Sequence, residues 1–149
     1  MNHHLLLILH LLAATVWVGG HLYLATCILP KVLKNNDAQS LLNFEKSFEP
    51  LGIPALLILV ITGIWMSLQF GISVKDWFSF SSPMERVVSI KLILLFSTVL
   101  FAISAQTRVI PALKKGKNKL VKMAIHITMV TLIGITMLVL GSFLRYGGF

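Results

Sequence analysis

The sequence predicts an all-α integral membrane protein, an antiparallel four-helix bundle with an amphipathic interfacial helix in its first connection. Of the 149 residues, 56% are hydrophobic and only 12% are charged, and the mean hydropathy is +0.87. This composition lies outside the usual range of soluble domains. A bilayer core about 30 Å thick needs about 20 apolar residues per helix. Segments of that kind, forming one domain, lie at about 5–29, 51–70, 87–110 and 120–144.

The first span and the connection after it carry the clearest local signals. The first span is expected to be retained, because no basic residue precedes it and it is longer than a signal-peptide core. In the first connection, Ser40 is a suitable N-cap for a short helix, and Leu41, Phe44 and Phe48 follow at helical spacing. This pattern predicts an amphipathic helix at the interface, which ends before Pro50 at the start of the second span.

The basic residues predict the orientation of the spans. The formal net charge is +8, and most Lys and Arg residues lie in the first and third connections, including the run "KKGKNK" at 114–119. Because Lys and Arg are retained on the cytoplasmic side, we expect these connections to be cytoplasmic and both termini to be outside, in a bacterial-type inner membrane. The same clustering favours anionic lipid headgroups rather than nucleic acid as the partner of this charge.

Two histidines share one face of the first span. His10 and His21 lie eleven residues apart, about three helical turns, and Trp17 lies between them on the same face. Ala13 and Ala14 allow another helix to approach this face closely. Ionisable side chains are costly in lipid, so we expect the face to point into the bundle.

An inner layer of polar residues is predicted about 24 Å from the outer edge, from a rise of about 1.5 Å per residue. His21 reaches it from the first span, His126 from the fourth, and Glu45 and Glu49 from the first connection, with Arg108 nearby. His21 and His126 are candidate ligands for a metal or a haem, with a glutamate assisting. The alternatives are histidines that hydrogen-bond across helices and glutamates on a solvated face.

An outer layer is predicted about 6 to 8 Å from the outer edge. It holds His10, Lys91, Trp65, Met66 and Met137. His10 with Met66 or Met137 is a candidate copper site, since thioethers suit Cu(I), whereas His10 with Lys91 is a candidate haem ligand pair or an anchor for an anionic group. The alternatives are a Lys91 side chain that snorkels outward and methionines that only fill space.

The chain resembles the copper resistance protein D (CopD) family in a short four-helix form. The segments that carry the resemblance are "HLLAATVWVGGHLYL", "FEKSFEPLGIPALLILVITGIWMS", "IKLILLFSTVLFAISAQTRVIPAL" and "HITMVTLIGITMLVLGSFLRYGG". The resemblance implies copper handling at the inner membrane, in uptake or homeostasis, together with a periplasmic copper carrier. Long members of the family have about twice as many spans, which favours a homodimer here.

A second resemblance is to the HemJ-type protoporphyrinogen oxidases, which are small four-helix proteins that bind haem b. It is carried by His10 before "VWVGG", by "PALL" with "GIW", and by Lys91 in "KLIL". It implies His10 and Lys91 as haem ligands. Under this alternative, His21 and His126 are a second possible ligand pair, and Arg108 and Arg145 are candidates to hold propionates.

The sequence is therefore compatible with three functions. The leading expectation is a copper-binding membrane protein that is not an enzyme, and the second is a haem b redox protein with oxidoreductase activity. The third is a scaffold whose polar residues only set the helix register. Soluble-enzyme patterns such as a glycine-rich phosphate loop, a nucleophile elbow or CxxC do not occur in the sequence.

Overall fold

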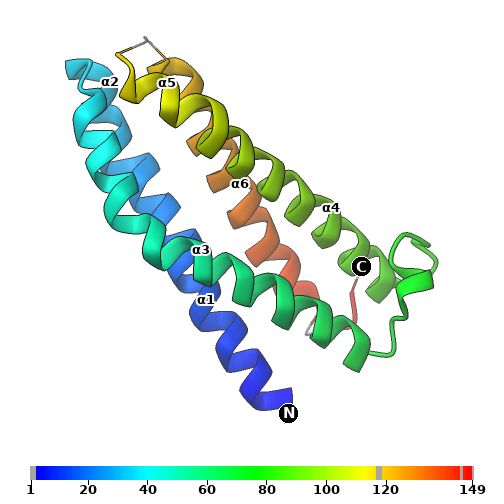
Figure 1. The fold of residues 1–149 in the computed structure, drawn as a ribbon. Coiled ribbons are helices and arrows are strands. Elements are labelled where there is room, and N and C mark those ends of the chain that lie inside the picture. The colour runs from blue at the N-terminus through cyan, green and yellow to red at the C-terminus, as the bar shows by residue number, and fades with distance from the viewer. Residues whose placement is uncertain (1–2, 117–118, 145, 149) are drawn as a thin grey trace.

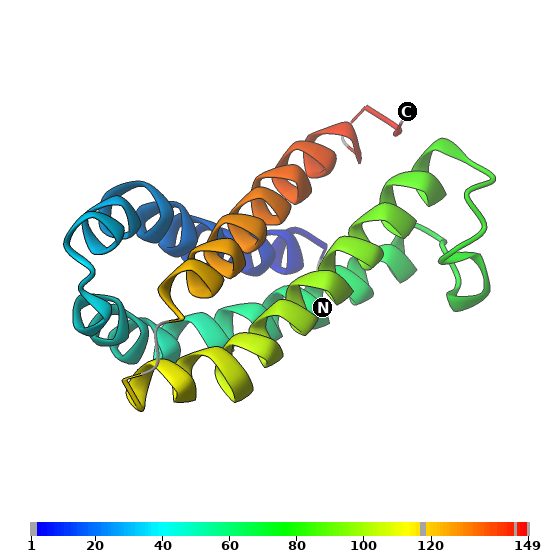
Figure 2. The same ribbon diagram turned by 90° about the horizontal axis from the view of Figure 1, so that it is seen from above.

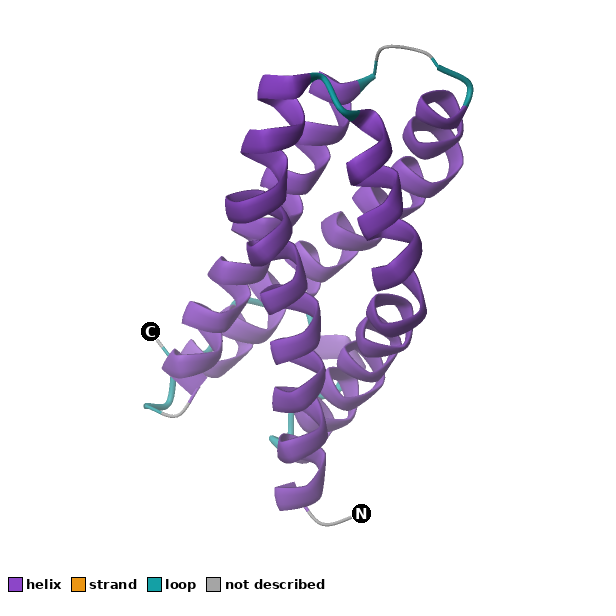
Figure 3. Ribbon diagram, turned by 90° about the vertical axis from the view of Figure 1, so that its left-hand side faces the viewer, coloured by secondary structure: helices purple, strands orange, loops and turns teal. Residues whose placement is uncertain are grey.

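The protein is a bundle of four long helices, as the sequence predicts. A computed structural model describes residues 3–116, 119–144 and 146–148, and in these residues all regular structure is helical (Figures 1 and 3). Four helical stretches are long and apolar enough to cross a membrane, namely His3–Asn35, Ala38–Gln69, Pro83–Lys114 and Leu120–Leu144. The chain is a multi-pass membrane protein.

Two of the long helices contain a π-helical turn, and this turn divides each of them. The first long helix consists of α1 (His3–Tyr23), the π-turn η1 (Leu24–Ile28) and α2 (Leu29–Asn35), and the second is α3 (Ala38–Gln69). A short 3-10 turn, η2 (Val74–Asp76), lies in the next connection. The third long helix consists of α4 (Pro83–Ser104), the π-turn η3 (Ala105–Val109) and α5 (Ile110–Lys114), and the fourth is α6 (Leu120–Leu144).

The four helices pack as two pairs. α3 lies along α1, α4 lies along α6, and the pairs meet where α1 and α6 cross (Figures 1 and 2). Val18 of α1 packs against Gly134 of α6 at that crossing, where a side chain in place of the glycine hydrogen would stand 3.2 Å from Val18 Cγ2. The backbones of α3 and α4 are farther from each other than those of the paired helices.

The distribution of side chains is that of a membrane bundle. Large apolar side chains such as Leu12, Leu57, Ile61 and Phe96 are exposed on the outside, where lipid solvates them. Small polar side chains are buried instead, and each donates to a backbone carbonyl of its own helix three or four residues earlier. These residues are Thr62, Ser67, Ser89, Thr98 and Thr131. Their hydroxyl groups are thus satisfied without water.

The predicted separate interfacial helix is corrected by the structure. The segment 38–50 is helical, but it is the first part of α3 and continues without a break through Pro50 and Pro54. Each proline removes only one N–H donor, and helices in membrane bundles tolerate this when a neighbouring helix supports them. α1 packs along α3 and gives that support.

The N-cap of this helix is Asp37 rather than Ser40. Asn36 ends α2 in the left-handed conformation with a φ of 51°, and this permits a turn of only two residues between α2 and α3. Asp37 Oδ1 then accepts from the Ser40 backbone N–H at 3.1 Å, and Asp37 Oδ2 accepts from Ser40 Oγ at 2.5 Å. The first connection is therefore a tight turn with an Asp cap.

The Asp37 cap predicts a local pH dependence. The hydrogen bonds from Ser40 hold the pKa of the Asp37 carboxyl below its ordinary value of 3.8. Because the folded pKa is lowered, the capping contribution is present above the unfolded pKa and is lost as the pH falls through the folded pKa. We expect the first-turn amides of α3 to lose hydrogen-exchange protection below about pH 4. Asp37→Asn keeps an N-cap that does not titrate, so in this variant the protection should stay constant across the same pH range. If the variant lost protection at low pH as the parent does, the assignment to Asp37 would be wrong.

Both π-turns immediately precede a proline at the same end of the bundle. The Leu29 N–H donates to Leu24 O and the Ile110 N–H donates to Ala105 O, five residues back in each case. Pro30 and Pro111 follow directly and have no N–H to donate. The wider turns let each helix pass its proline and continue, and such turns often lie at functional sites.

Candidate functional site in the bundle interior

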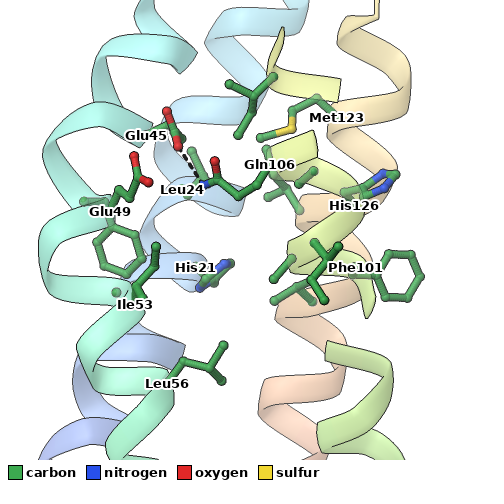
Figure 4. A pocket seen from close by; sticks show the side chains of 18 of the residues that line it. His21, Leu24, Glu45, Glu49, Ile53, Leu56, Phe101, Gln106, Met123 and His126 are labelled. Carbon is green, nitrogen blue, oxygen red and sulfur yellow. Dashed lines mark hydrogen bonds between the residues drawn. The ribbon is translucent and has the colours of Figure 1, made fainter. Parts of the chain in front are cut away.

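A cavity of about 350 Å³ lies between the α1–α3 pair and the α4–α6 pair, beside both π-turns (Figure 4). Its walls are mostly apolar, and its polar residues are at the end nearer the π-turns. The lining residues with polar or ionisable side chains are Trp17, His21, Glu45, Glu49, Gln106, Thr107 and His126. All four side chains of the predicted inner-layer pairs, two histidines and two glutamates, thus line one cavity.

His21 directs a free ring nitrogen into this cavity. Its Nδ1 lies 2.8 Å from Trp17 O, and because a carbonyl only accepts, Nδ1 carries the proton and donates. Nε2 therefore holds a lone pair, and it has no hydrogen-bond partner among the described residues. The ring contacts Trp17, at a centroid distance of 4.4 Å, and Phe48, at 5.7 Å. These contacts fix both the tautomer and the orientation of the imidazole.

Glu45 is held by a residue of the third long helix. Gln106 Nε2, in η3, donates to Glu45 Oε1 at 2.9 Å across the cavity (Figure 4). Glu49 lies one helical turn further along α3 and also lines the cavity. The two carboxylates lie among lining residues that include no Lys or Arg. The electrostatic character of the cavity is therefore negative.

His126 lines the same cavity, but both of its ring nitrogens are in use. Nδ1 donates to Lys122 O at 2.8 Å, so Nε2 accepts from Ser104 Oγ at 3.1 Å. Phe101 packs edge-on against the ring at a centroid distance of 5.4 Å. Figure 4 shows the ring directed away from His21. His126 must leave Ser104 before it can bind a metal ion.

The predicted outer layer lies outside this cavity. His10 Nδ1 donates to Thr62 Oγ1 at 2.8 Å, since the Thr62 hydroxyl itself donates to Ile58 O. Lys91 is half-buried, and its Nζ is 3.5 Å from where a Cβ on Gly141 would stand. In the part of the chain that the structure describes, Lys91 has no ion-pair partner and Nε2 of His10 has no hydrogen bond.

The other predicted residues that the structure describes do not line the cavity. Met66 and Met137 are half-buried and do not line the cavity, while Trp65 and Arg108 are exposed. Arg145 lies outside the described residues. Within the ranges 3–116, 119–144 and 146–148, no group of three or more His, Cys, Asp or Glu side chains lies close enough together to hold a metal ion. The structure therefore provides single candidate ligands around a cavity and no assembled metal centre.

The sequence reasoning missed three hydrogen-bond partners of these residues. Gln106 binds Glu45, Ser104 binds His126, and Thr62 binds His10. Each is a polar residue inside an otherwise apolar span, which is the signal that identifies such partners. The second missed signal is a Thr four residues before a Pro, which occurs in both helices that contain a π-turn.

The fold and the cavity define the class of this protein, a four-helix membrane protein with histidine and carboxylate side chains around an interior cavity. The family model described as copper resistance protein D (CopD) matches residues 42–144. The chain belongs to the CopD family, which makes it a membrane protein of copper resistance and homeostasis and confirms the first of the two resemblances. No curated protein and no solved structure matches the chain.

Proposed function

We propose that the protein holds a copper ion in the interior cavity, with His21 Nε2 as its first ligand, as one step of copper uptake or homeostasis. Membership of the CopD family supports copper as the cargo. The observation that carries the proposal is the free Nε2 of His21, whose opposite ring nitrogen is already hydrogen-bonded to Trp17 O. A neutral imidazole in this state is ready to bind a metal ion without losing a hydrogen bond.

The remaining ligands would come from side chains that already line the cavity. Glu45 and Glu49 offer carboxylate oxygens, His126 offers a second imidazole, and buried Met123 offers a thioether that suits Cu(I). The Gln106 hydrogen bond uses only Oε1 of Glu45, so this carboxylate can bind a metal ion where it stands, whereas His126 must first leave Ser104. The two carboxylates and the lack of lining Lys or Arg favour entry of a cation.

We further propose where this step takes place. The excess of Lys in α2, in the first part of α3 and around the α5–α6 connection supports a cytoplasmic location for that end of the bundle in a bacterial inner membrane. The opposite end, near His10, would then receive copper from a periplasmic carrier. A homodimer would supply the number of spans that long family members have in one chain. Selective labelling, in intact cells, of single cysteines introduced into the α5–α6 connection and into the second connection tests the orientation.

The direct test of the proposed function is metal analysis of the protein purified in detergent, with an absorption spectrum of the same sample. We expect stoichiometric copper and no Soret band, because the cavity offers ligands for a small ion. A Soret band that sharpens on reduction, together with stoichiometric iron, would overturn the copper proposal. It would favour the haem b alternative instead, in which His10 and Lys91 are the first ligands to test.

A further inference from the structure

We infer that the interior cavity also binds the neutral head group of a quinone or quinol that enters sideways from the lipid, between α3 and α4. The inference goes beyond copper binding, because it is argued from two other features of the cavity. These are its opening toward the membrane and the hydrogen-bonding and aromatic groups around His21. A redox compound dissolved in the membrane would thereby reach the interior of the bundle.

The opening is formed by apolar side chains of α3 and α4, whose backbones lie apart. Ile53 of α3 and Ile103 of α4 both line the cavity and are also 45% and 54% exposed on the outer surface of the protein. Leu56 and Val99 lie on the same two walls. Because the outer surface of the spans faces lipid, an apolar tail can pass between α3 and α4 while its head lies inside.

The inner end of the cavity suits a flat ring with oxygen substituents. Trp17, Phe44 and Phe48 line it on the α1–α3 side. His21 Nε2 is a free acceptor, and the neighbouring Trp17 is only 6% exposed. A quinol hydroxyl can donate to the imidazole. The cavity volume of about 350 Å³ lies within the range of small-molecule sites.

Charge distinguishes this class of ligand from ordinary phospholipids. The lining residues include Glu45 and Glu49 and no Lys or Arg, so an anionic phosphate head would be repelled. Most lysines are instead in α2, in the first part of α3 and around the α5–α6 connection, where anionic headgroups can bind outside the cavity. A neutral head with carbonyl or hydroxyl groups fits the cavity better.

The test titrates copper-free, detergent-purified full chain with a decyl-substituted benzoquinone and measures quenching of Trp17 fluorescence, in a background of Trp65→Phe and Trp77→Phe. We expect saturable quenching. Val99→Phe, which fills the cavity wall, should weaken it at least about tenfold, as steric overpacking does. Leu100→Phe is the matched control, because its side chain is exposed and does not line the cavity, and it should bind as the parent does.

A second pair covers the case in which Val99→Phe does not fold. Leu56→Phe on the opposite wall should weaken quenching, while its exposed neighbour Leu57→Phe should not. Quenching that rises linearly without saturation, or that is equal in wall and control variants, would overturn the inference. Recovery of Trp17 fluorescence on addition of anionic phosphatidylglycerol would also overturn it, because it would show that a phospholipid head competes for the cavity. Copper analysis of the same variants is a separate readout, so failure of quinone binding and failure of copper binding are distinguishable.

Discussion

Replacing His21 by phenylalanine is expected to abolish stoichiometric copper binding while the protein remains folded. Phenylalanine keeps an aromatic ring between Trp17 and Phe48, so the packing around the position is retained. It removes the lone pair of Nε2. Among the histidines that line the cavity in the described chain, this is the only ring nitrogen that is not already hydrogen-bonded. Mutating a residue that only hydrogen-bonds a metal ligand lowers metal affinity about 10- to 100-fold, and the loss here should be larger because the ligand itself is removed. Metal analysis and copper titration of the purified variant measure it.

His126 and Ser104 supply the comparison for this prediction. His126→Phe should weaken copper binding less than His21→Phe does, because His126 Nε2 is free to bind only after it leaves Ser104. Ser104→Ala removes that competing hydroxyl, so it should leave copper affinity unchanged or raise it. The exposed His4 is the neutral control, and His4→Ala should bind copper as the parent does. If His21→Phe retains full copper stoichiometry, the proposed site is wrong.

Replacing Gly20 by alanine is expected to destabilise the bundle and disturb the cavity. The added Cβ would overlap the Phe48 ring, so the ring would have to shift, and Gly52 already packs closely against its other edge. Phe48 is also stacked on Phe44 at 5.5 Å and packed against His21. Overpacking of this kind costs about 1–3 kcal/mol, which outweighs the about 1 kcal/mol of helix propensity that alanine gains over glycine. Thermal unfolding in detergent, followed by circular dichroism, should show a lower midpoint.

The neighbouring glycine is a matched control for this effect. A Cβ at Gly19 would meet nothing within 4 Å, so Gly19→Ala should leave stability unchanged or raise it slightly. A second change tests the mechanism directly, since Phe48→Leu in the Gly20→Ala background makes room for the new methyl group and should restore part of the lost stability. Equal unfolding midpoints for Gly19→Ala and Gly20→Ala would show that the packing of Phe48 does not require glycine at position 20.

The depth of each polar residue was predictable from the sequence, because depth depends only on position along a helix of known rise. His21, His126, Glu45 and Glu49 were expected at one level, and all four line one cavity. The direction of each ring was not predictable, because it depends on helix rotation and on local hydrogen bonds. Ser104 turns His126 to one side, and Trp17 O sets the tautomer of His21. The roles of these residues in metal binding remain predictions.

The helix boundaries also depended on contacts that the sequence alone does not reveal. The tight α2–α3 turn depends on the left-handed Asn36 and the Asp37 cap, and the continuity of α3 through Pro50 and Pro54 depends on support from α1. A proline and a good N-cap residue such as Ser40 are local signals for a break. They fail here because contacts between helices outweigh local preference.

By itself, the sequence determined the number of spans, the all-helical fold and the family, because a bilayer imposes a length and an apolar character on every segment that crosses it. Only the tertiary structure decided that α3 and α4 stay apart, that a cavity forms between them, and that His21 alone among the lining histidines keeps a free nitrogen. The physical reason is that hydropathy acts on each segment separately. The packing of Phe48 against Gly20 and Gly52, and the hydrogen bonds that cross from helix to helix, exist only when the segments meet.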